Sequence, residues 1–407
     1  MSNNNKNTHP IKSTTMRSTS PITTKFKVAA LALALFSTTF TACKTSMEED
    51  LAPQETTEKT QTVVSASDLD ETAEKGSYHL KGYTLKGVFD FPIGAAVVYE
   101  RLKNEPYSST LKREFSRLSS ESNFKFHMLQ PKENEFVFTK ADEIVNFAQQ
   151  NKMQVHGHTL IWALDGMTPD WVLNYKGGAK EFDQLLKNHI YTVVKHFKGK
   201  VTSWDVVNEA LTPNGTYVDN IWLRKLGEGY LLKAFQYASE ADPKAKLFAN
   251  DYSQEYGGKK LKKYLKIADE ARAKGIRFDG LGFQMHTVLR VDANMVQKSF
   301  EMTSAKGLLV HISEMDVALR YQKPSTFDLT DSLSRAQGAK YKELVYAYLN
   351  GVPKHLRFGI TTWGVADKDS YFNRNYVNSN HDYPLLFSKD YKAKWAYRGF
   401  IEAGLGR

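Results

Sequence analysis

The run "SWDVVNEAL", from Ser203 to Leu211, joins an apolar strand pattern to a short amide and a carboxylate. Its apolar half is typical of a strand that is buried on both faces, as in a parallel sheet covered by helices. The strand ends on Asn208 and Glu209, and no basic residue stands beside the carboxylate. Because an unpaired charge is costly inside a core, we expect this end of the strand to open onto a functional cleft.

Seven other short apolar runs resemble this one, and helical patterns separate most of them. The eight expected strands lie in Gly94–Val98, Phe124–Leu129, Gln154–Trp162, Val201–Leu211, Lys246–Tyr252, Gly280–His286, Leu308–Val317 and Arg357–Val365. Expected helices include Lys140–Asn151, Phe182–His196, Gly229–Ala241 and Leu333–Leu349. Eight β–α units in about 320 residues predict an α/β fold, a (β/α)8 TIM barrel forming a single catalytic domain.

Polar residues end most of these strands. In a barrel of this kind the catalytic side chains stand at the carboxyl ends of the strands. The residues expected there are His158, Glu209, Asn250, Gln284, His286, Glu314 and Trp363. A pair such as Glu209 and Glu314 is what glycoside hydrolysis needs, since one carboxyl protonates the leaving oxygen and the other attacks the sugar or activates water. The alternative is that each glutamate caps a helix or pairs with a cation.

Other chemistries lack their motifs in this sequence. There is no HExxH motif, no cysteine and histidine cluster, no GxSxG motif and no phosphate loop, so we expect neither a metal nor a cofactor. The basic run Lys259–Lys266 is interpreted as a solvated helix face, and nucleic-acid binding is not expected. The net charge of +10 falls to +5, with 50 basic against 45 acidic residues, once the five basic residues of the first 43 are removed.

The N-terminal region predicts an exported protein. "KFKVAALALALFSTTFTAC", ending at Cys43, has the basic start, apolar stretch and small residues of a signal peptide, whose translation begins at Met1 or Met16. "FTAC" resembles a bacterial lipobox, which implies a lipidated Cys43; an ordinary secretory signal is the alternative. We expect a signal in residues 1–43, a flexible tether in 44–77 and the barrel in 78–407. The expected location is the cell envelope, as an outer-membrane lipoprotein, or the secreted fraction.

The part from about residue 80 to 405 resembles glycoside hydrolase family 10, the endo-β-1,4-xylanase family. The resemblance rests on several motifs that follow one another in the family's order. These are "GHTLIW" from Gly157, "WDVVNEAL" from Trp204, "LFANDY" from Leu247, "FDGLGFQMH" from Phe278, "HISEMDV" from His311 and "TTWGVADKDS" from Thr361.

The resemblance implies a role for each member of the catalytic group. Glu209 corresponds to the general acid/base and Glu314 to the nucleophile of a mechanism that retains anomeric configuration. Asn208 corresponds to the residue that binds the 2-hydroxyl of the reacting sugar. His286 corresponds to the histidine beside the nucleophile and Asp316 to the acid that orients it. Without the motif, a satisfied core histidine would be the favoured interpretation of His286.

The implied sugar-binding set matches less uniformly. It comprises Glu121, Lys125, His158, Trp162, Gln284, Trp363 and Tyr371. On the glycon side the family's Glu-Asn-x-Met-Lys reads "ESNFK" here, with Ser122 and Phe124 as departures. The family's His-Ser-Gln after the third strand is replaced by residues 163–165, which read Ala-Leu-Asp, and Tyr371 stands where a second Trp is common. These changes leave the ordinary xylose specificity in question.

Together these features predict a retaining endo-β-1,4-xylanase that acts as a monomer on a xylan-like polysaccharide and meets the membrane only through the anchor at Cys43. One alternative is the same chemistry on a related β-glycan, such as mixed β-1,3/1,4-xylan or another plant or algal polysaccharide. A second alternative is a non-catalytic, surface glycan-binding lipoprotein.

Overall fold

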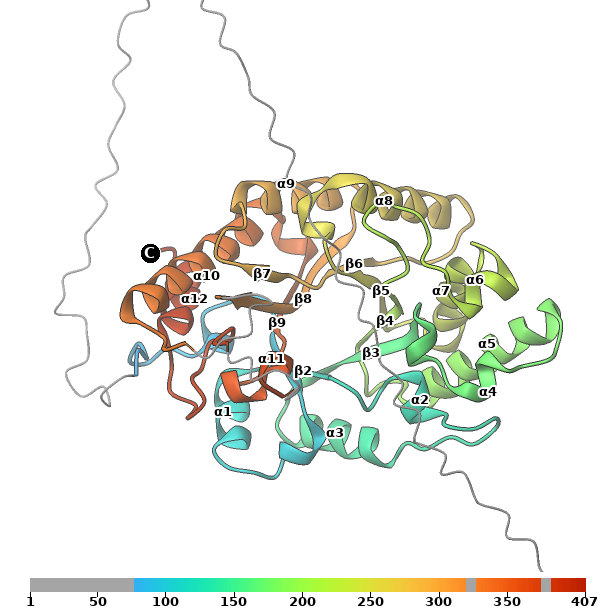
Figure 1. Cartoon of the computed structure of the whole chain (residues 1–407), viewed down its shortest axis with the longest axis horizontal. Coiled ribbons are helices and arrows are strands. Elements are labelled where there is room, and N and C mark those ends of the chain that lie inside the picture. Colours follow the sequence, from blue (N-terminus) through green and yellow to red (C-terminus); the bar gives the residue numbers. More distant parts are fainter. Residues whose placement is uncertain (1–76, 320–326, 375–381) are drawn as a thin grey trace, which may run out of the picture. The chain divides into compact units, whose positions relative to one another are not determined.

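A computed structural model describes residues 77–319, 327–374 and 382–407 of the chain (Figure 1). The expected signal in residues 1–43, the lipidation site Cys43 and nearly all of the expected tether lie outside the described residues. Among the helices of the described part, none is both long enough and apolar enough to cross a membrane.

The strands form a closed parallel barrel, which confirms the predicted (β/α)8 fold. In the described residues the barrel strands are β1 Ile93–Val97, β2 Arg117–Ser120, β3 Gln154–Trp162, β4 Ser203–Asn208, β5 Lys246–Asp251, β6 Gly280–Phe283, β8 Leu309–Ala318 and β9 Arg357–Thr362. Consecutive strands pair in parallel, β9 returns to β1, and β6 pairs directly with β8. The short strand β7, His286–Val288, pairs with the carboxyl-terminal end of β8. All carboxyl ends therefore meet at one edge.

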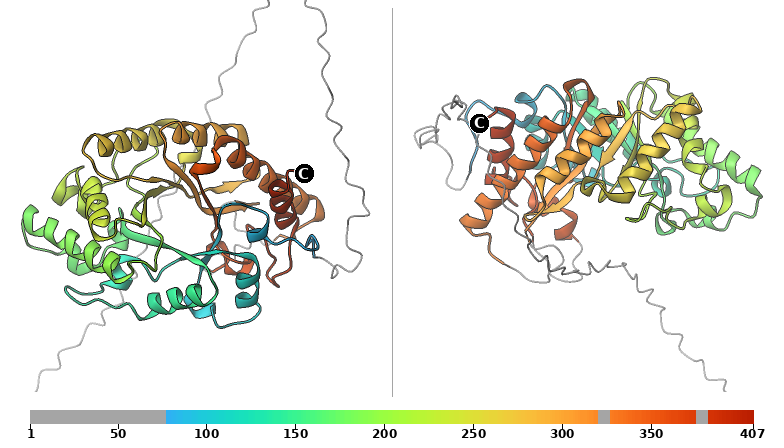
Figure 2. Two further views of the ribbon diagram at one scale, coloured as in Figure 1. Left: turned by 180° about the vertical axis from the view of Figure 1, so that it is seen from behind. Right: turned by 90° about the horizontal axis from the view of Figure 1, so that it is seen from above.

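Helices lie around the outside of this barrel (Figures 1 and 2). The four helices expected from the sequence are confirmed as α3 Thr139–Gln150, α5 Ala179–His196, α7 Tyr230–Ala241 and α10 Asp331–Gly351. The remaining helices of the described residues are α1 Tyr107–Glu114, α2 Phe126–Leu129, α4 Asp170–Leu173, α6 Ile221–Leu226, α8 Gly258–Ala273, α9 Ala293–Ser304, α11 Tyr371–Arg374 and α12 Trp395–Gly404. Their buried apolar faces cover the strands, as the amphipathic patterns require.

The predicted position of the second strand, Phe124–Leu129, is wrong. Residues 124–129 contain the short helix α2, and the strand that occupies the second place in the barrel is β2, "RLSS". Two apolar residues three apart, Phe126 and Leu129, are both buried in α2, and at this length such a pattern does not distinguish a helix turn from a strand. β2 is buried along its whole length although three of its four residues are polar. The two serines are small enough for a narrow barrel, and the Arg117 guanidinium donates to Gln154 and to the carbonyl of Phe358.

The basic run in α8 is also only partly as expected. Lys259, Lys262 and Lys266 are exposed, which agrees with a solvated face. Lys260 is 1% exposed, and its ammonium lies 2.6 Å from a carboxylate oxygen of Asp251 at the end of β5. The helix therefore brings one cation beneath the carboxyl edge of the barrel, where it neutralises a buried acid.

Candidate active site

Strand register brings the predicted residues together at the carboxyl edge of the barrel. Trp162 of β3 is paired with Asn208 of β4, and Asn208 is paired with Asn250 of β5. Gly282 of β6 lies beside Asn250, and a Cβ atom there would come within 2.4 Å of the Asn250 side-chain oxygen. The absence of a side chain at Gly282 therefore leaves room for the Asn250 amide at the carboxyl end of the barrel.

Glu209 follows β4 in a left-handed backbone conformation, with φ of 56°. This conformation is unusual for a residue other than glycine and is often found at functional sites. The amide of Glu209 donates to the carbonyl of Asn250 at 2.9 Å. Its carboxylate accepts hydrogen bonds from the Trp162 indole and from the Gln284 amide, each at 2.9 Å. Both oxygens of Glu209 are thus held by neutral donors, one at the end of β3 and one just after β6.

Glu314 lies within β8 and is 4% exposed. The Asn250 amide donates to Oε1 at 2.7 Å, and Ser313 Oγ in turn donates to Asn250 Oδ1 at 2.6 Å. Nε2 of His286 lies 3.3 Å from Oε2 of Glu314. Burial acts to raise the pKa of Glu314, but the hydrogen bonds from His286 and Asn250 and the positive charge of His286 outweigh it and hold the pKa below its usual value. The carboxylate is therefore kept ionised.

His286 stands between two carboxylates. The pairing of β7 with β8 places it opposite Asp316, whose Oδ2 lies 2.7 Å from Nδ1 of the imidazole. Burial opposes a charge on this ring, but Asp316 and Glu314 together raise the pKa of His286 well above its ordinary value. Burial also raises the pKa of Asp316, against the pull of His286. The arrangement is that of an imidazolium that donates to Glu314 from one nitrogen and to Asp316 from the other.

A chain of amide contacts connects the two glutamates. Gln284, which binds Glu209, also lies 3.5 Å from Oδ1 of Asn208. The same oxygen accepts from the amide of Asn250 at 2.9 Å, and Asn250 binds Glu314. Nδ2 of Asn208 is buried and has no hydrogen-bond partner among the described residues. A buried donor needs a partner, so this amide is available to a ligand hydroxyl.

The expected sugar contacts surround this group. His158 is 2% exposed; its Nδ1 lies 2.9 Å from Asp205 Oδ2, and its ring meets Trp363 edge-on at 5.2 Å between centroids. The Lys125 ammonium lies 4.5 Å from the centre of the Trp162 ring. Tyr371 packs edge-on against His286 at 5.4 Å, and Glu121, 8% exposed, follows β2. The structure therefore places every member of the predicted set on the β→α connections or strand ends of one face.

Three contributors were absent from the predicted set. Asn250 was recognised as a strand end but given no role, although it joins Glu314 to Asn208. Ser313 orients Asn250. Asp205 lies mid-strand in β4, 1% exposed, with His158 Nδ1 and His156 Nε2 at 2.9 and 3.0 Å from one oxygen. An aspartate inside an otherwise apolar strand was the available signal, since a buried charge requires partners.

The departures on the glycon side have packing roles. Asp165 Oδ1 accepts from the amide of Ile221 at the start of α6 at 2.7 Å, and Oδ2 binds the Arg224 guanidinium. Both carboxylate oxygens of Asp165 are therefore engaged by α6. Phe124 is 0% exposed and Ala163 is 1% exposed, so these two side chains belong to the core. The remaining candidates for a direct effect on the glycon are Ser122 and Leu164, which are exposed, and the half-buried Tyr371.

The strand ends of this barrel carry two glutamates, one held by neutral donors and one by an amide and an imidazolium. This arrangement is typical of one class of protein, the glycoside hydrolases with a barrel fold. The family model described as glycosyl hydrolase family 10 matches residues 82–403. The chain belongs to this family.

Known relatives agree with this assignment. The chain is 36% identical over 343 residues to endo-beta-1,4-xylanase Xyn10C of Cellvibrio japonicus, covering 78% of this chain and 56% of that protein. It is 38% identical over 323 residues to a beta-1,4-xylanase of Dictyoglomus thermophilum, covering 77% of this chain and 89% of the relative. The chain thus spans little more than half the length of the first relative and most of the second.

Solved structures resemble the described barrel closely. Native xylanase10C of Cellvibrio japonicus superposes with a TM-score of 0.76 at 34% identity, covering 81% of this chain and 75% of that one. Native xylanase 10B of Thermotoga maritima gives 0.73 at 32% identity, covering 80% and 98%. A mutant of the Cellvibrio enzyme was solved in complex with xylopentaose and gives 0.77 at 34% identity, covering 81% and 70%.

Proposed function

We propose that this chain is a retaining endo-β-1,4-xylanase that cleaves internal bonds of a xylan-type polysaccharide. The observation that carries the proposal is the amide chain between Glu209 and Glu314, which ties the two carboxylates to one small volume at the strand ends. Membership of family 10 and the xylanase names of the relatives support the substrate class.

The first chemical step forms a glycosyl-enzyme. An oxygen of Glu314 attacks the anomeric carbon while the bond to the leaving oxygen breaks, and the proton of Glu209 passes to that oxygen. His286 and Asn250 keep Glu314 ionised in the ground state, with a pKa below its usual value. The free Nδ2 of Asn208 donates to the 2-hydroxyl, a contact that strengthens as positive charge grows on the sugar.

The second step releases the sugar. Glu209, now a carboxylate, removes a proton from water, whose oxygen bonds to the anomeric carbon as the ester to Glu314 breaks. The two inversions restore the original configuration. Trp162 and Gln284 hold Glu209 by hydrogen bonds that suit both its acid and its base duties, because neither donor carries a charge.

The test is reducing-sugar release from linear β-1,4-xylan by the wild type and by Glu314→Ala. The variant should lose at least about a hundredfold in kcat and still bind long oligosaccharides. Azide or formate should restore turnover with inverted product, because the shortened side chain admits an external nucleophile. Retention of more than a few per cent of wild-type activity by the variant would contradict the role of Glu314.

A panel of glycans separates this proposal from its two rivals. Faster cleavage of mixed β-1,3/1,4-xylan or another algal or plant β-glycan would keep the mechanism and change the substrate. Binding without release of reducing ends from any glycan would identify a surface glycan-binding protein. Two intact glutamates in hydrogen-bonded positions argue against that last outcome, since a binding protein needs neither as an acid nor as a nucleophile.

We also propose that the enzyme is a lipoprotein of the cell envelope, anchored through Cys43 and separated from the membrane by the tether of residues 44–77. The support is the sequence pattern that precedes the only cysteine in the chain. The lipid and the tether would hold the barrel near the cell surface.

A further inference from the structure

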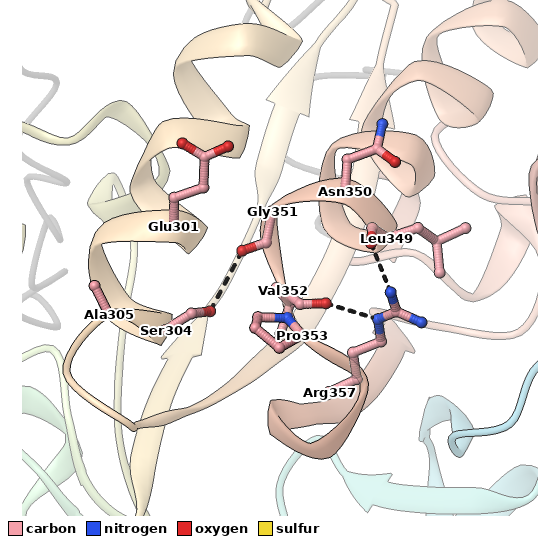
Figure 3. Close-up of a pocket in the computed structure, with 9 residues that line it drawn as sticks. All are labelled: Glu301, Ser304, Ala305, Leu349, Asn350, Gly351, Val352, Pro353 and Arg357. Atoms are coloured by element: carbon pink, nitrogen blue, oxygen red, sulfur yellow. Dashed lines mark hydrogen bonds between the residues drawn. The ribbon is translucent and has the colours of Figure 1, made fainter.

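Two pockets in the described part of the barrel lie at opposite ends of it. The first, of about 460 Å³, is bounded by the last turns of α9 and α10 and by the start of β9 (Figure 3). Helix ends that lead into strands lie on the face opposite the catalytic one. Its polar groups already bind one another, since Arg357 donates to the carbonyls of Leu349 and Val352, and Ser304 donates to Gly351.

The second pocket, of about 310 Å³, belongs to the catalytic face. It is lined by residues of the connection that follows α2, by Trp171 and Tyr175 after β3, and by the first turns of α5. Connections that follow a strand, and the helix turns they lead into, lie at the carboxyl end of the barrel. A polymer that crosses this face to reach the catalytic pair can therefore also reach the pocket.

The chemistry of the lining suits a neutral, polyhydroxylated ligand. Four carboxamides, among them Gln184 and Asn188, and the two carboxylates of Glu133 and Glu181 line it, together with two aromatic rings. Planar amides and carboxylates exchange paired hydrogen bonds with neighbouring hydroxyls, and aromatic faces pack on apolar sides of a ring. No lysine or arginine lines it, and two carboxylates would repel an anion, so phosphate-bearing ligands are excluded.

One wall of the pocket is held in place by hydrogen bonds to neighbouring residues. Gln130 is 2% exposed; its Oε1 lies 2.9 Å from Nδ1 of His189, and its carbonyl accepts from the Trp171 indole at 3.1 Å. These two bonds hold Gln130 in place, and its side chain lines the pocket together with that of Tyr175. A preformed wall of this kind needs little reorganisation to bind a ligand.

We propose that this pocket is a secondary glycan-binding site that takes a short neutral segment of the same polysaccharide the catalytic cleft cleaves. The proposal rests on the proposed function for the identity of the polymer. A volume near the lower limit for ligand sites suits about one or two pyranose rings. Binding of a second segment of one chain raises the effective concentration of the polymer at the cleft, so the benefit applies to long substrates and not to short ones.

The experiment compares polymer and short-substrate kinetics. The variant Gln184→Ala/Asn188→Ala removes two exposed amides from the pocket, and Asn350→Ala removes one exposed amide from the pocket of Figure 3 as a matched control. Each lost hydrogen bond should weaken polymer binding by about two- to tenfold. In the double variant, the half-saturating concentration of β-1,4-xylan should rise by at least the factor for one lost bond. The value of kcat/KM on an aryl xylobioside should stay at that of the wild type. The control should match the wild type on both.

A second readout does not depend on activity. Hydrogen exchange on the Glu314→Ala chain should show protection of residues 171–188 by linear xylohexaose, and the double variant should lose that protection. Equal kinetics on both substrates together with no protection would overturn the secondary site. If the wild type fails to cleave xylan but the panel of glycans still protects residues 171–188, the proposed function fails and the pocket stands.

Discussion

At the scale of single residues, the site depends on one cation placed between two acids. His286 contacts Glu314 with one nitrogen and Asp316 with the other. Glu314 and Asp316 are almost wholly buried, so neither could stay ionised cheaply without that partner. His286 thus helps to keep Glu314, the proposed nucleophile, ionised.

Replacing His286 by Gln should shift the acid limb of the kcat/KM profile to higher pH. With the imidazolium gone, burial is left to raise the pKa of Glu314, so the carboxylate becomes protonated at a pH where the wild type is still active. The measurement is kcat/KM on xylan from about pH 3 to 8. Tyr371→Phe, which keeps the imidazole, is the control, and an unmoved acid limb in the Gln variant would contradict this account.

The same histidine should make stability depend on pH. The pKa of His286 is raised in the folded state, so the ring contributes stability that is fully present below its unfolded pKa of about 6.5 and is lost as the pH rises through the folded pKa. The free energy of unfolding of His286→Gln should therefore fall furthest below wild type near pH 6 and approach it at high pH. Urea titrations at several pH values measure this, and a constant difference would count against it.

At the scale of elements, α8 and β5 are joined by a buried ion pair beside Glu209. Asp251 accepts from Lys260 and from the Tyr264 hydroxyl, and the amide of Leu211 donates to it just beyond the catalytic turn. Burial raises the pKa of Asp251, the nearby Glu209 acts in the same direction, and Lys260 opposes them; together they bring this pKa to about 6. The pair therefore fixes the segment that carries Glu209, the proposed acid/base.

Lys260→Met should destabilise the fold by about 3–5 kcal/mol, because it leaves the buried Asp251 carboxylate without its cation. Adding Asp251→Asn in the same chain should recover part of the loss, since no uncompensated charge then remains. Lys262→Met, at an exposed position of the same helix, should change stability by less than about 0.5 kcal/mol. Denaturant midpoints measure all three, and equal effects at positions 260 and 262 would show that the ion pair is unimportant.

The connections after β2 and β3 invite a separate test of the glycon side. Ser122→Asn restores an amide donor at an exposed position, and one hydrogen bond should raise kcat/KM on short linear xylo-oligosaccharides by about two- to tenfold. Asp165→Gln should give no such gain, because its target is α6, and should instead weaken the contact with Arg224. A loss on mixed-linkage or decorated chains by Ser122→Asn would indicate that serine makes room for a different natural substrate.

At the scale of the whole molecule, the proposed membrane anchor in the N-terminal region can be tested independently of the barrel. If Cys43 is lipidated, the protein produced in bacteria should label with radioactive palmitate and partition into detergent. Cys43→Ser should abolish both and leave xylan hydrolysis unchanged, because the anchor and tether lie outside the barrel. A wild-type protein that is exported but never labelled would identify an ordinary secretory signal.

The sequence by itself determined the barrel, the two glutamates and most of the ring of polar residues around them. Those features are local: an apolar run ending in a polar residue can be recognised without knowing what lies beside it. The prediction of the second strand was the exception. The residues of β2, "RLSS", are mostly polar, and they are buried because neighbouring elements cover them.

Only the tertiary structure decided which groups share a partner. Lys260 of α8 forms an ion pair with Asp251 of β5. Asp165 accepts from the amide of Ile221, 56 residues further along the chain. The Asn250 amide donates both to Asn208 of β4 and to Glu314 of β8. The secondary pocket likewise unites the connections after β2 and β3 with α5. Each of these depends on distances between segments far apart in the chain. Residue type and spacing do not encode such distances, because the same residue can face solvent, core or cleft according to how the strands are paired.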